Sequence, residues 1–343
     1  MGSMHSKKSP SATCDEIDTG LASGERTRER KAFVVLTIRP ASPADVPGSG
    51  RICYDAFASI ASQHGFPPDV ASIDAANWLM SGLIAHPGFF SVVAECDGRI
   101  VGTSFLDERS AIAGIGHVTV APDAQDHRIG RALMGTVLQR CEHRRIPGVR
   151  LLQAAYHYRS MSLYAKLGFD VREPFAAMQG DPVALHIPGY GVRTATTGDI
   201  EACNALCLRV HGHDRGGELR SVLIYGEVRV VERGGRITGY TTGISFYGHS
   251  VAETNDDLQA LIGAAESFAG PGFLVPMRNT ELLRWCMAHG LRVFVVVNLM
   301  TIGLYSEPRG AFLASTWYLW PAFRAGTRPR AESRSCSGRM APM

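Results

Sequence analysis

The sequence predicts an α+β protein made of two consecutive copies of one plan, each a mixed, largely antiparallel sheet flanked by helices. Three observations predict this fold class. A chain of 343 residues, 45% apolar and 20% charged, can form two globular domains with separate cores. The phrase Ile38-Arg-Pro-Ala-Ser-Pro-Ala-Asp45 returns with the same spacing as Val192-Arg-Thr-Ala-Thr-Thr-Gly-Asp199. Each copy then continues with a hairpin and closes with a strand, a helix and a glycine turn into another strand.

Turn and cap residues set the elements of the first copy. Ser42 and Asp45 can cap a helix, and Asp97-Gly98 between apolar runs is a strong hairpin signal. Gly168 ends the last helix before a further strand. The expected elements are a strand at 33–39, a helix at 52–60, hairpin strands at 89–96 and 99–106, a strand at 149–155 and a helix at 160–167.

The second copy repeats this order. Thr197 and Asp199 precede its first helix, Arg233-Gly-Gly235 forms its hairpin turn, and Gly290 ends its last helix. The expected elements are a strand at 191–194, a helix at 200–210, hairpin strands at 226–232 and 236–243, a helix at 258–268, a strand at 272–276 and a helix at 280–289.

The composition divides the chain into four segments. Residues 1–31 are polar and without periodicity, and residues 322–343 are rich in Arg, Ser and Pro, so we expect two flexible tails. The segments are a tail at 1–31, a first domain at 32–187, a second domain at 188–321 and a basic tail at 322–343.

The most informative stretch runs from Val118 to Leu133. It predicts a buried strand, a turn opened by Pro122 and a helix that begins near Gly130. A helix start leaves several backbone N–H groups unpaired, and together with the helix dipole these favour a phosphate. Gln125 and Arg131 add donors beside the turn. An ordinary strand-to-helix turn is the alternative interpretation.

This order of strand, Val-x-Pro, polar turn and glycine-bearing helix resembles the pyrophosphate-binding motif of the GNAT acetyltransferase superfamily, whose donor is acetyl-CoA. The segment Ser160-Met-Ser-Leu-Tyr-Ala-Lys-Leu-Gly-Phe169 resembles a second segment of that family. The resemblance implies that the backbone of Val118 and Val120 holds the pantetheine, and that Tyr164 is the general acid for the departing thiolate. It also implies a pyrophosphate cradle made of Gln125, Asp126, His127, Arg128, Ile129, Gly130, Arg131 and Ala132.

The sequence departs from the family pattern at two positions. Arg128 stands where the family favours glycine, and Tyr158 stands where related sequences often carry asparagine. A positive φ at an arginine costs about 1 kcal/mol or more, although the guanidinium could offset this by contacting phosphate. Weaker binding of acetyl-CoA is therefore an open alternative.

The general base remains open in the sequence. An alkylamine is mostly protonated at neutral pH, so a group that accepts its proton is useful. His117, on the presumed fourth strand, and Asp107 and Glu108, after the third, are the candidates, and a relay through water requires no residue.

The second copy lacks the features that would bind a pyrophosphate. Its corresponding turn has no Gly-x-Gly, and Asp256 and Asp257 fall in the first helical turn, where they would repel phosphate. Its acceptor-site candidates are His211, His213, Asp214 and Arg278. The first three could bind an acceptor, supply the base or form an ordinary polar loop, and Arg278 could cap a helix. His-x-His is poor evidence for metal, so we expect none.

The resemblance implies an N-acetyltransferase that moves the acetyl group of acetyl-CoA to a primary amine by direct attack in a ternary complex. A small molecule or a peptide could supply the amine. The alternative is a non-catalytic sensor that binds acyl-CoA or another ligand. A net charge of +3 argues against a nucleic-acid partner, no apolar run is long enough for a membrane helix, and eight dispersed cysteines suggest reduced thiols in a cytoplasm.

Overall fold

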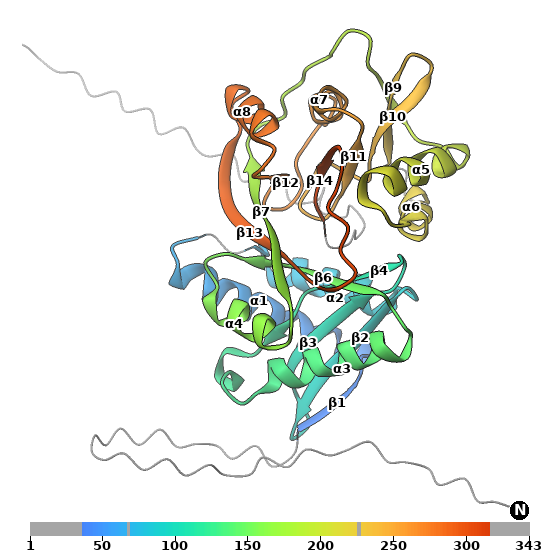
Figure 1. The fold of residues 1–343 in the computed structure, drawn as a ribbon. Coiled ribbons are helices and arrows are strands. Elements are labelled where there is room, and N and C mark those ends of the chain that lie inside the picture. Colours follow the sequence, from blue (N-terminus) through green and yellow to red (C-terminus); the bar gives the residue numbers. More distant parts are fainter. Residues whose placement is uncertain (1–35, 67–68, 225–227, 316–343) are drawn as a thin grey trace, which may run out of the picture.

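The computed structural model describes residues 36–66, 69–224 and 228–315, which form two halves joined by one long sheet (Figure 1). The two predicted tails, at 1–31 and 322–343, lie outside the described residues. The first half comprises β1 (Leu36–Pro40), η1 (Pro43–Asp45), α1 (Val46–Gln63), α2 (Ile73–Ala85), β2 (Phe89–Cys96), β3 (Arg99–Asp107), β4 (Ile112–Ile115), β5 (Thr119–Val120), η2 (Pro122–Ala124), α3 (Ile129–His143), β6 (Gly148–Ala154), α4 (Tyr158–Lys166) and β7 (Asp170–Gln179).

The second half repeats the order of strands and helices, as the sequence predicts. It comprises β8 (Gly191–Thr194), η3 (Thr197–Asp199), α5 (Ile200–His211), α6 (Gly216–Leu223), β9 (Arg229–Arg233), β10 (Arg236–Thr241), β11 (Ser250–Ala252), α7 (Asn255–Gly263), β12 (Phe273–Pro276), α8 (Thr280–Ala288), β13 (Arg292–Gly303) and β14 (Ala311–Leu313). The α+β fold class with mixed, largely antiparallel sheets is confirmed.

Local signals located most elements well, and two predictions need correction. Asp97 and Gly98 both have positive φ and close the predicted hairpin of β2 and β3. The helix expected at 258–268 instead occupies Asn255–Gly263, because Thr254 caps it at its start. The strand expected through Val118 and Val120 is broken, since β4 ends at Ile115 and β5 begins at Thr119.

The two halves exchange strands. The long sheet has the order β1-β2-β3-β4-β6-β13-β7-β12, with β5 paired to β3. Strand β13 belongs to the second half by sequence, yet it runs antiparallel between β6 and β7 of the first. Strand β7 in turn pairs with β12 of the second half. The two copies are therefore not self-contained, because hydrogen bonds of one half's sheet are completed by the other half.

The second sheet has the order β14-β11-β10-β9-β8 and meets the long sheet at a bridge between Leu274 and Ala314. In the first half, α3 covers one face of the sheet, where its Leu133 clusters with Leu106 of β3. The neighbouring residue Phe105 points to the opposite face and packs with Leu79 of α2. Helices thus cover both faces of the sheet beside the strands that carry the predicted site (Figure 1).

Candidate functional site

The central strands of the first half separate after Ile115. Strand β4 pairs with β6 in parallel as far as Ile115 and Leu151. Beyond that point β5 pairs with β3 and not with β6. Strand β6 keeps its other neighbour, β13, along its whole length. Strands that part in this way leave backbone N–H and C=O groups along the gap, and such groups can bind an extended ligand. Val118 and Val120 lie on the β5 side of this gap.

The N-terminus of α3 lies beside the gap and has no side-chain cap. A Cβ on Gly130 would be 3.7 Å from the side chain of Val120 and 3.4 Å from that of Leu163, so the helix begins between β5 and α4. Its first turn contains no acidic residue. Arg131 and His127 are exposed there. Uncapped N–H groups, the helix dipole and exposed basic side chains together favour an anion.

The turn before α3 is held by α4. Arg159 donates to the side-chain oxygens of Gln125, at 3.1 Å, and of Asp126, at 2.6 Å. Gln125 also donates to the carbonyl of Val120 at 3.4 Å, and His127 Nδ1 lies 2.9 Å from the carbonyl of Gln125. The predicted cradle residues therefore form one loop tied to the following helix.

Arg128 and Asp126 are the residues of this turn that adopt a left-handed backbone. Their φ values are 60° and 72°, in the left-handed region, whereas Gly130 is helical and has room for a Cβ. Arg128 therefore adopts the backbone that the family motif gives to glycine, at a cost of about 1 kcal/mol. Its side chain is exposed, which leaves the guanidinium available to a phosphate.

Tyr164 projects from α4, the helix that also contacts the start of α3 through Leu163. Its side chain is 8% exposed, and its ring centroid lies 6.0 Å from that of Phe169. Burial raises the pKa of Tyr164 to about 12, so the phenol carries its proton at neutral pH. Tyr164 belongs to the same apolar cluster as Ile129 of α3, and Val120 of β5 packs against that cluster.

A strand of the second half supports this region. Asn298 on β13 donates to the side-chain oxygen of Gln153 on β6, at 3.1 Å, and both residues are buried. The amide nitrogen of Gln153 then donates to the carbonyl of His157 at 2.9 Å and to the hydroxyl of Ser160 at 3.2 Å. Gln153 therefore orients the start of α4, and Asn298 fixes Gln153.

The geometry does not support Glu108 or Asp107 as the base. Arg140 donates to the two carboxylate oxygens of Glu108 at 2.8 and 3.0 Å, and Arg144 lies 3.3 Å away. Asp107 is held by Arg109 at 2.7 and 2.9 Å. A carboxylate whose oxygens are both occupied by guanidinium donors is poorly placed to contact a substrate amine.

His117 lies in the break between β4 and β5, among aromatic rings. Its ring centroid is 5.4 Å from that of Phe57 on α1 and 6.3 Å from that of Tyr247 in the second half. Burial lowers the pKa of His117 to about 4. The imidazole is therefore neutral at physiological pH and remains a candidate, although its basicity is reduced.

Asp69 is a further candidate that the sequence did not reveal. It precedes α2, and burial raises the pKa of its carboxyl to about 6. Burial and the charge of Asp69 raise the pKa of Tyr156, just after β6, to about 12, and they also raise the pKa of Tyr247. The charge of Asp69 therefore acts on two tyrosines from distant segments of the chain. No local motif marks it, since its environment comes from distant segments.

The corresponding helix start in the second half is closed. The hydroxyl of Thr254 accepts from the N–H of Asp257 at 3.3 Å, and the carboxylate of Asp257 accepts from the N–H of Thr254 at 3.1 Å. Asp257 is fully buried and also binds Arg233 and Thr238. The N-terminus of α7 is therefore capped by its own carboxylate, unlike that of α3.

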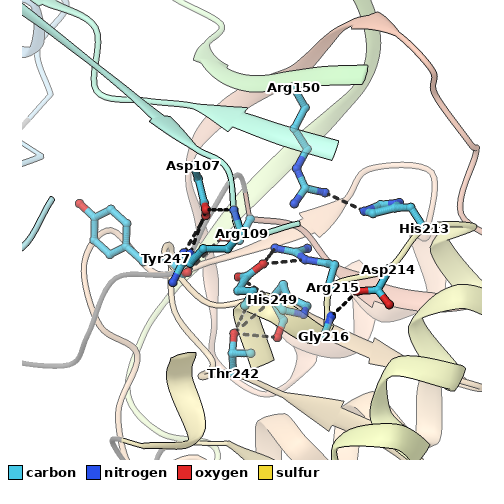
Figure 2. A network of polar contacts seen from close by, with 12 residues as sticks. Asp107, Arg109, Arg150, His213, Asp214, Arg215, Gly216, Thr242, Tyr247 and His249 are labelled. Atoms are coloured by element: carbon cyan, nitrogen blue, oxygen red, sulfur yellow. Dashed lines mark hydrogen bonds and ion pairs between the residues drawn. The ribbon is translucent and has the colours of Figure 1, made fainter. Parts of the chain in front are cut away.

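The predicted acceptor residues do not form one site. His211 and His213 lie together, with ring centroids 5.7 Å apart, but next to Arg150, which lies before the strand gap (Figure 2). Asp214 precedes α6 and accepts a hydrogen bond from the backbone N–H of Gly216, its first residue, at 2.8 Å. Arg278 pairs with Glu173 at 2.8 Å and with Glu307.

A buried polar network joins the two halves around these histidines. Arg215, 1% exposed, pairs with Glu218 at 2.6 Å, and Glu218 lies 3.2 Å from Nδ1 of His249. The hydroxyl of Tyr240 lies 2.9 Å from Nε2 of His249. Figure 2 shows Arg150 reaching toward this network from the first half. Sequence reasoning did not single out Arg150 or Glu218, because their partners come from distant segments.

The described residues offer neither a metal site nor a membrane-spanning helix. In the described ranges, no group of three or more His, Cys, Asp or Glu side chains is arranged to hold a metal ion. No helix within those same ranges combines the length and apolar character required to cross a membrane. The six cysteines in this part of the structure are buried free thiols.

Known proteins resemble both the site region and the overall fold. Residues 55–169 match the model of the acetyltransferase (GNAT) family. Mycothiol acetyltransferase from Tsukamurella paurometabola is 30% identical over 148 residues, which are 41% of this chain and 51% of that protein. The chain therefore spans about half the length of that curated relative.

Two solved structures share the fold over most of the chain. A candidate acetyltransferase from Pyrococcus horikoshii has a TM-score of 0.62 and 17% identity, over 83% of this chain and 95% of that one. A GCN5-related N-acetyltransferase from Sphaerobacter thermophilus has a TM-score of 0.53 and 16% identity, over 79% and 96% of the two chains. Residues 55–169 therefore match the GNAT family, and the chain shares the overall fold of these two solved structures.

Proposed function

We propose that this protein is an acetyl-CoA-dependent N-acetyltransferase that acts on a primary amine. Residues 55–169 match the GNAT acetyltransferase family. The observation that carries this proposal is the combination of three features on neighbouring elements of the first half. These are the gap between β5 and β6, the uncapped start of α3 and the buried phenol of Tyr164. The gap suits pantetheine, the helix start suits pyrophosphate, and the phenol suits a departing thiolate.

The proposed reaction is direct transfer in a ternary complex. The amine nitrogen attacks the thioester carbonyl, the carbon–sulfur bond breaks, and Tyr164 donates its proton to the sulfur. The second proton that the nitrogen loses as the amide forms returns to the phenolate of Tyr164 through solvent, so the phenol is restored. The ammonium proton of the amine passes to a base before attack. The backbone N–H groups along the gap are suited to polarise the carbonyl. Residues Gln125 to Ala132 form the proposed pyrophosphate cradle.

We assign the proton-accepting role to Asp69, with His117 as the alternative. A carboxyl with a pKa near 6 is largely ionised at neutral pH and is a stronger base than an ordinary aspartate. Asp69 belongs to the segment between α1 and α2, close to Tyr156 at the open end of β6. A carboxylate also suits a positively charged amine, because the two charges attract.

The second half is proposed as a partner that binds no CoA. The internal cap on α7 and the buried carboxylate of Asp257 support this assignment. Its contribution to the reaction is structural, through Asn298 on β13 and Tyr247 near His117. The acceptor is a small molecule or a peptide with a primary amine.

Calorimetric titration with acetyl-CoA tests the proposal. We expect one site per chain, weakened at least tenfold by Arg131→Ala at the start of α3. The matched control is Arg284→Ala, an exposed arginine on α8, which should leave the affinity unchanged. Release of free CoA thiol with a panel of primary amines then measures turnover.

Two outcomes would contradict parts of the proposal. No binding at millimolar acetyl-CoA would mean that the turn at Arg128 does not accept a pyrophosphate, and the acetyltransferase assignment would have to be abandoned. Binding without turnover across the amine panel would instead favour a non-catalytic acyl-CoA sensor.

A further inference from the structure

A cavity of about 50 Å³ lies at the junction of the two halves, apart from the strand gap. Arg150 of β6 and Thr301 of β13 line it from the long sheet. His211, His213 and Arg215 line it from the turn between α5 and α6. Arg150 lies where β6 is still paired with β4, so the cavity is at the closed end of that strand pair.

Arg150 is buried without a compensating charge. It is 8% exposed, and within the described residues it forms no ion pair. Its Nη1 lies 3.4 Å from Nε2 of His213, and its Nε has no hydrogen-bond partner in the same part of the chain. The other buried arginines here are paired, Arg215 with Glu218 and Arg109 with Asp107. Three guanidinium groups therefore face two carboxylates.

His211 adds a ring nitrogen without a hydrogen-bond partner to the same cavity, beside His213. His211 is 7% exposed, and its Nε2 lacks a hydrogen-bond partner among the described residues. His213 Nδ1 lies 3.1 Å from the carbonyl of His211, so Nδ1 is the protonated nitrogen and Nε2 faces Arg150. Burial and nearby Arg150 lower the pKa of His213 to about 3 when no anion is present. Buried polar atoms without partners are uncommon in folded proteins, and they point to a ligand here.

We infer that this cavity binds an oxyanion, a phosphate or a carboxylate group, through the guanidinium of Arg150 and Nε2 of His211, with His213 positioning Arg150. One anion supplies the charge that the three guanidinium groups lack. It also gives Nε of Arg150 and Nε2 of His211 an acceptor. This inference does not depend on the proposed acetyl transfer, because none of these residues lies at the strand gap.

The size of the cavity suits a small group with an opening to solvent. A volume of about 50 Å³ exceeds what one water molecule requires. Gly212 and Ser306 are exposed members of its lining. A surface hollow of about 510 Å³ shares Gly212, Ser306 and Pro308 with the cavity. An organic anion would therefore place its charged group inside and the rest of the molecule in this hollow.

Thermal unfolding of the full chain in added anions tests the inference. Sodium phosphate should raise the Tm in a saturable manner, beyond the effect of sodium chloride at equal ionic strength. In the Arg150→Met variant, the phosphate concentration that gives half of the maximal rise in Tm should be at least tenfold higher than in the parent. The Tm of this variant without anion should equal or exceed that of the parent, because an unpaired buried charge has been removed.

Control variants separate the cavity from the pyrophosphate loop. Arg131→Ala should keep the phosphate response, which assigns it to the cavity and not to α3. Arg229→Gln, which removes a surface arginine paired with Glu266, should keep it as well. His213→Gln should weaken the response at least threefold, and it serves as the test variant if Arg150→Met does not fold.

Succinate in place of phosphate distinguishes the two ligand chemistries. A response that saturates at lower succinate concentration identifies a carboxylate site, and the reverse identifies a phosphate site. An equal phosphate response in the parent, Arg150→Met and His213→Gln would overturn the inference. A parent response no larger than that to sodium chloride would overturn it as well.

Discussion

The guanidinium of Arg193 donates two hydrogen bonds to the carboxylate of Asp199, at 2.8 and 2.9 Å. Arg39 binds Asp45 in the first half in the same way, at 2.8 and 2.8 Å. Each aspartate also accepts from the backbone N–H three residues earlier, at 2.7 Å. The two repeated sequence segments therefore form the same structural motif. In each half, an arginine on the first strand binds the aspartate that caps the start of the first helix.

Breaking either motif should destabilise the protein. We expect Asp199→Asn and Asp45→Asn each to lower the free energy of unfolding by about 1–2 kcal/mol, because each loses a helix cap and charged hydrogen bonds. Urea denaturation measures the change. The control is Asp55→Asn, whose exposed pair with Arg51 on α1 should contribute at most about 0.5 kcal/mol. A loss no greater than in the control would contradict the assignment.

The same pairs predict acid sensitivity. Arg39 and Arg193 hold the pKa of Asp45 and Asp199 well below the ordinary value of 3.8. A depressed pKa stabilises the folded state above the unfolded-state value, and this contribution is lost as the pH falls below it. The parent should therefore lose stability below about pH 4 more steeply than the double variant with asparagine at both positions. Tm measured from pH 7 to pH 3 checks this, and parallel curves would refute it.

Removing Asn298 should affect both stability and turnover. Asn298→Ala leaves the buried oxygen of Gln153 without its donor, which should cost about 1–3 kcal/mol. Because Gln153 orients the start of α4, acetyl transfer should also slow. Asn255→Ala breaks the contacts of Asn255 with Asn279 and Glu281 in the second half, and its turnover should be unchanged. Equal turnover in both variants would show that Asn298 on β13 does not support the reaction.

Tyr164→Phe tests the proposed general acid. Loss of the phenol proton should lower kcat by roughly 100-fold or more, while the affinity for acetyl-CoA stays within about threefold. Steady-state kinetics and calorimetry on the same preparation provide both numbers. Phenylalanine fills the same buried space beside Phe169, so the fold should persist. An unchanged kcat would remove Tyr164 from the mechanism.

Asp69→Asn tests the proposed base through the pH profile. A base must be deprotonated, so kcat/KM of the parent should rise with pH through an apparent pKa of about 6. In the variant this limb should disappear and the rate at neutral pH should fall. Asp74→Asn, an exposed aspartate in the first turn of α2, should keep the limb. If the limb survives in Asp69→Asn, the proton goes elsewhere, with His117 the next residue to replace.

Neutralising Glu218 should strongly lower the free energy of unfolding, because it disrupts the junction of the two halves. Glu218→Gln leaves the fully buried Arg215 without its carboxylate, and removal of one partner from such a pair costs roughly 3–5 kcal/mol. Urea denaturation of Glu266→Gln is the comparison, because its exposed pair with Arg229 should contribute less than about 1 kcal/mol. Similar losses in the two variants would show that the junction network is dispensable.

Local signals made several parts of this protein predictable. The Asp97-Gly98 hairpin, the repeated caps at Asp45 and Asp199 and the helix start at Ile129 to Ala132 depend on residues within a few positions of each other. Such features follow from backbone preferences and short hydrogen bonds, which a sequence displays directly. The two-copy plan and the α3 turn were therefore visible without coordinates.

The tertiary structure alone decided the rest. The sequence by itself could not show that β13 lies between β6 and β7, because strand pairing joins residues such as Gln153 and Asn298, which are 145 positions apart. Asp69 has no local motif, and its raised pKa comes from the burial that the fold imposes. The local sequence around His211 and His213 predicts an acceptor site, whereas the fold places Arg150, 63 positions from His213, beside it. The burial and the charge balance of a residue depend on which distant segments contact it. The local sequence does not show these contacts, because they form only when the sheet assembles.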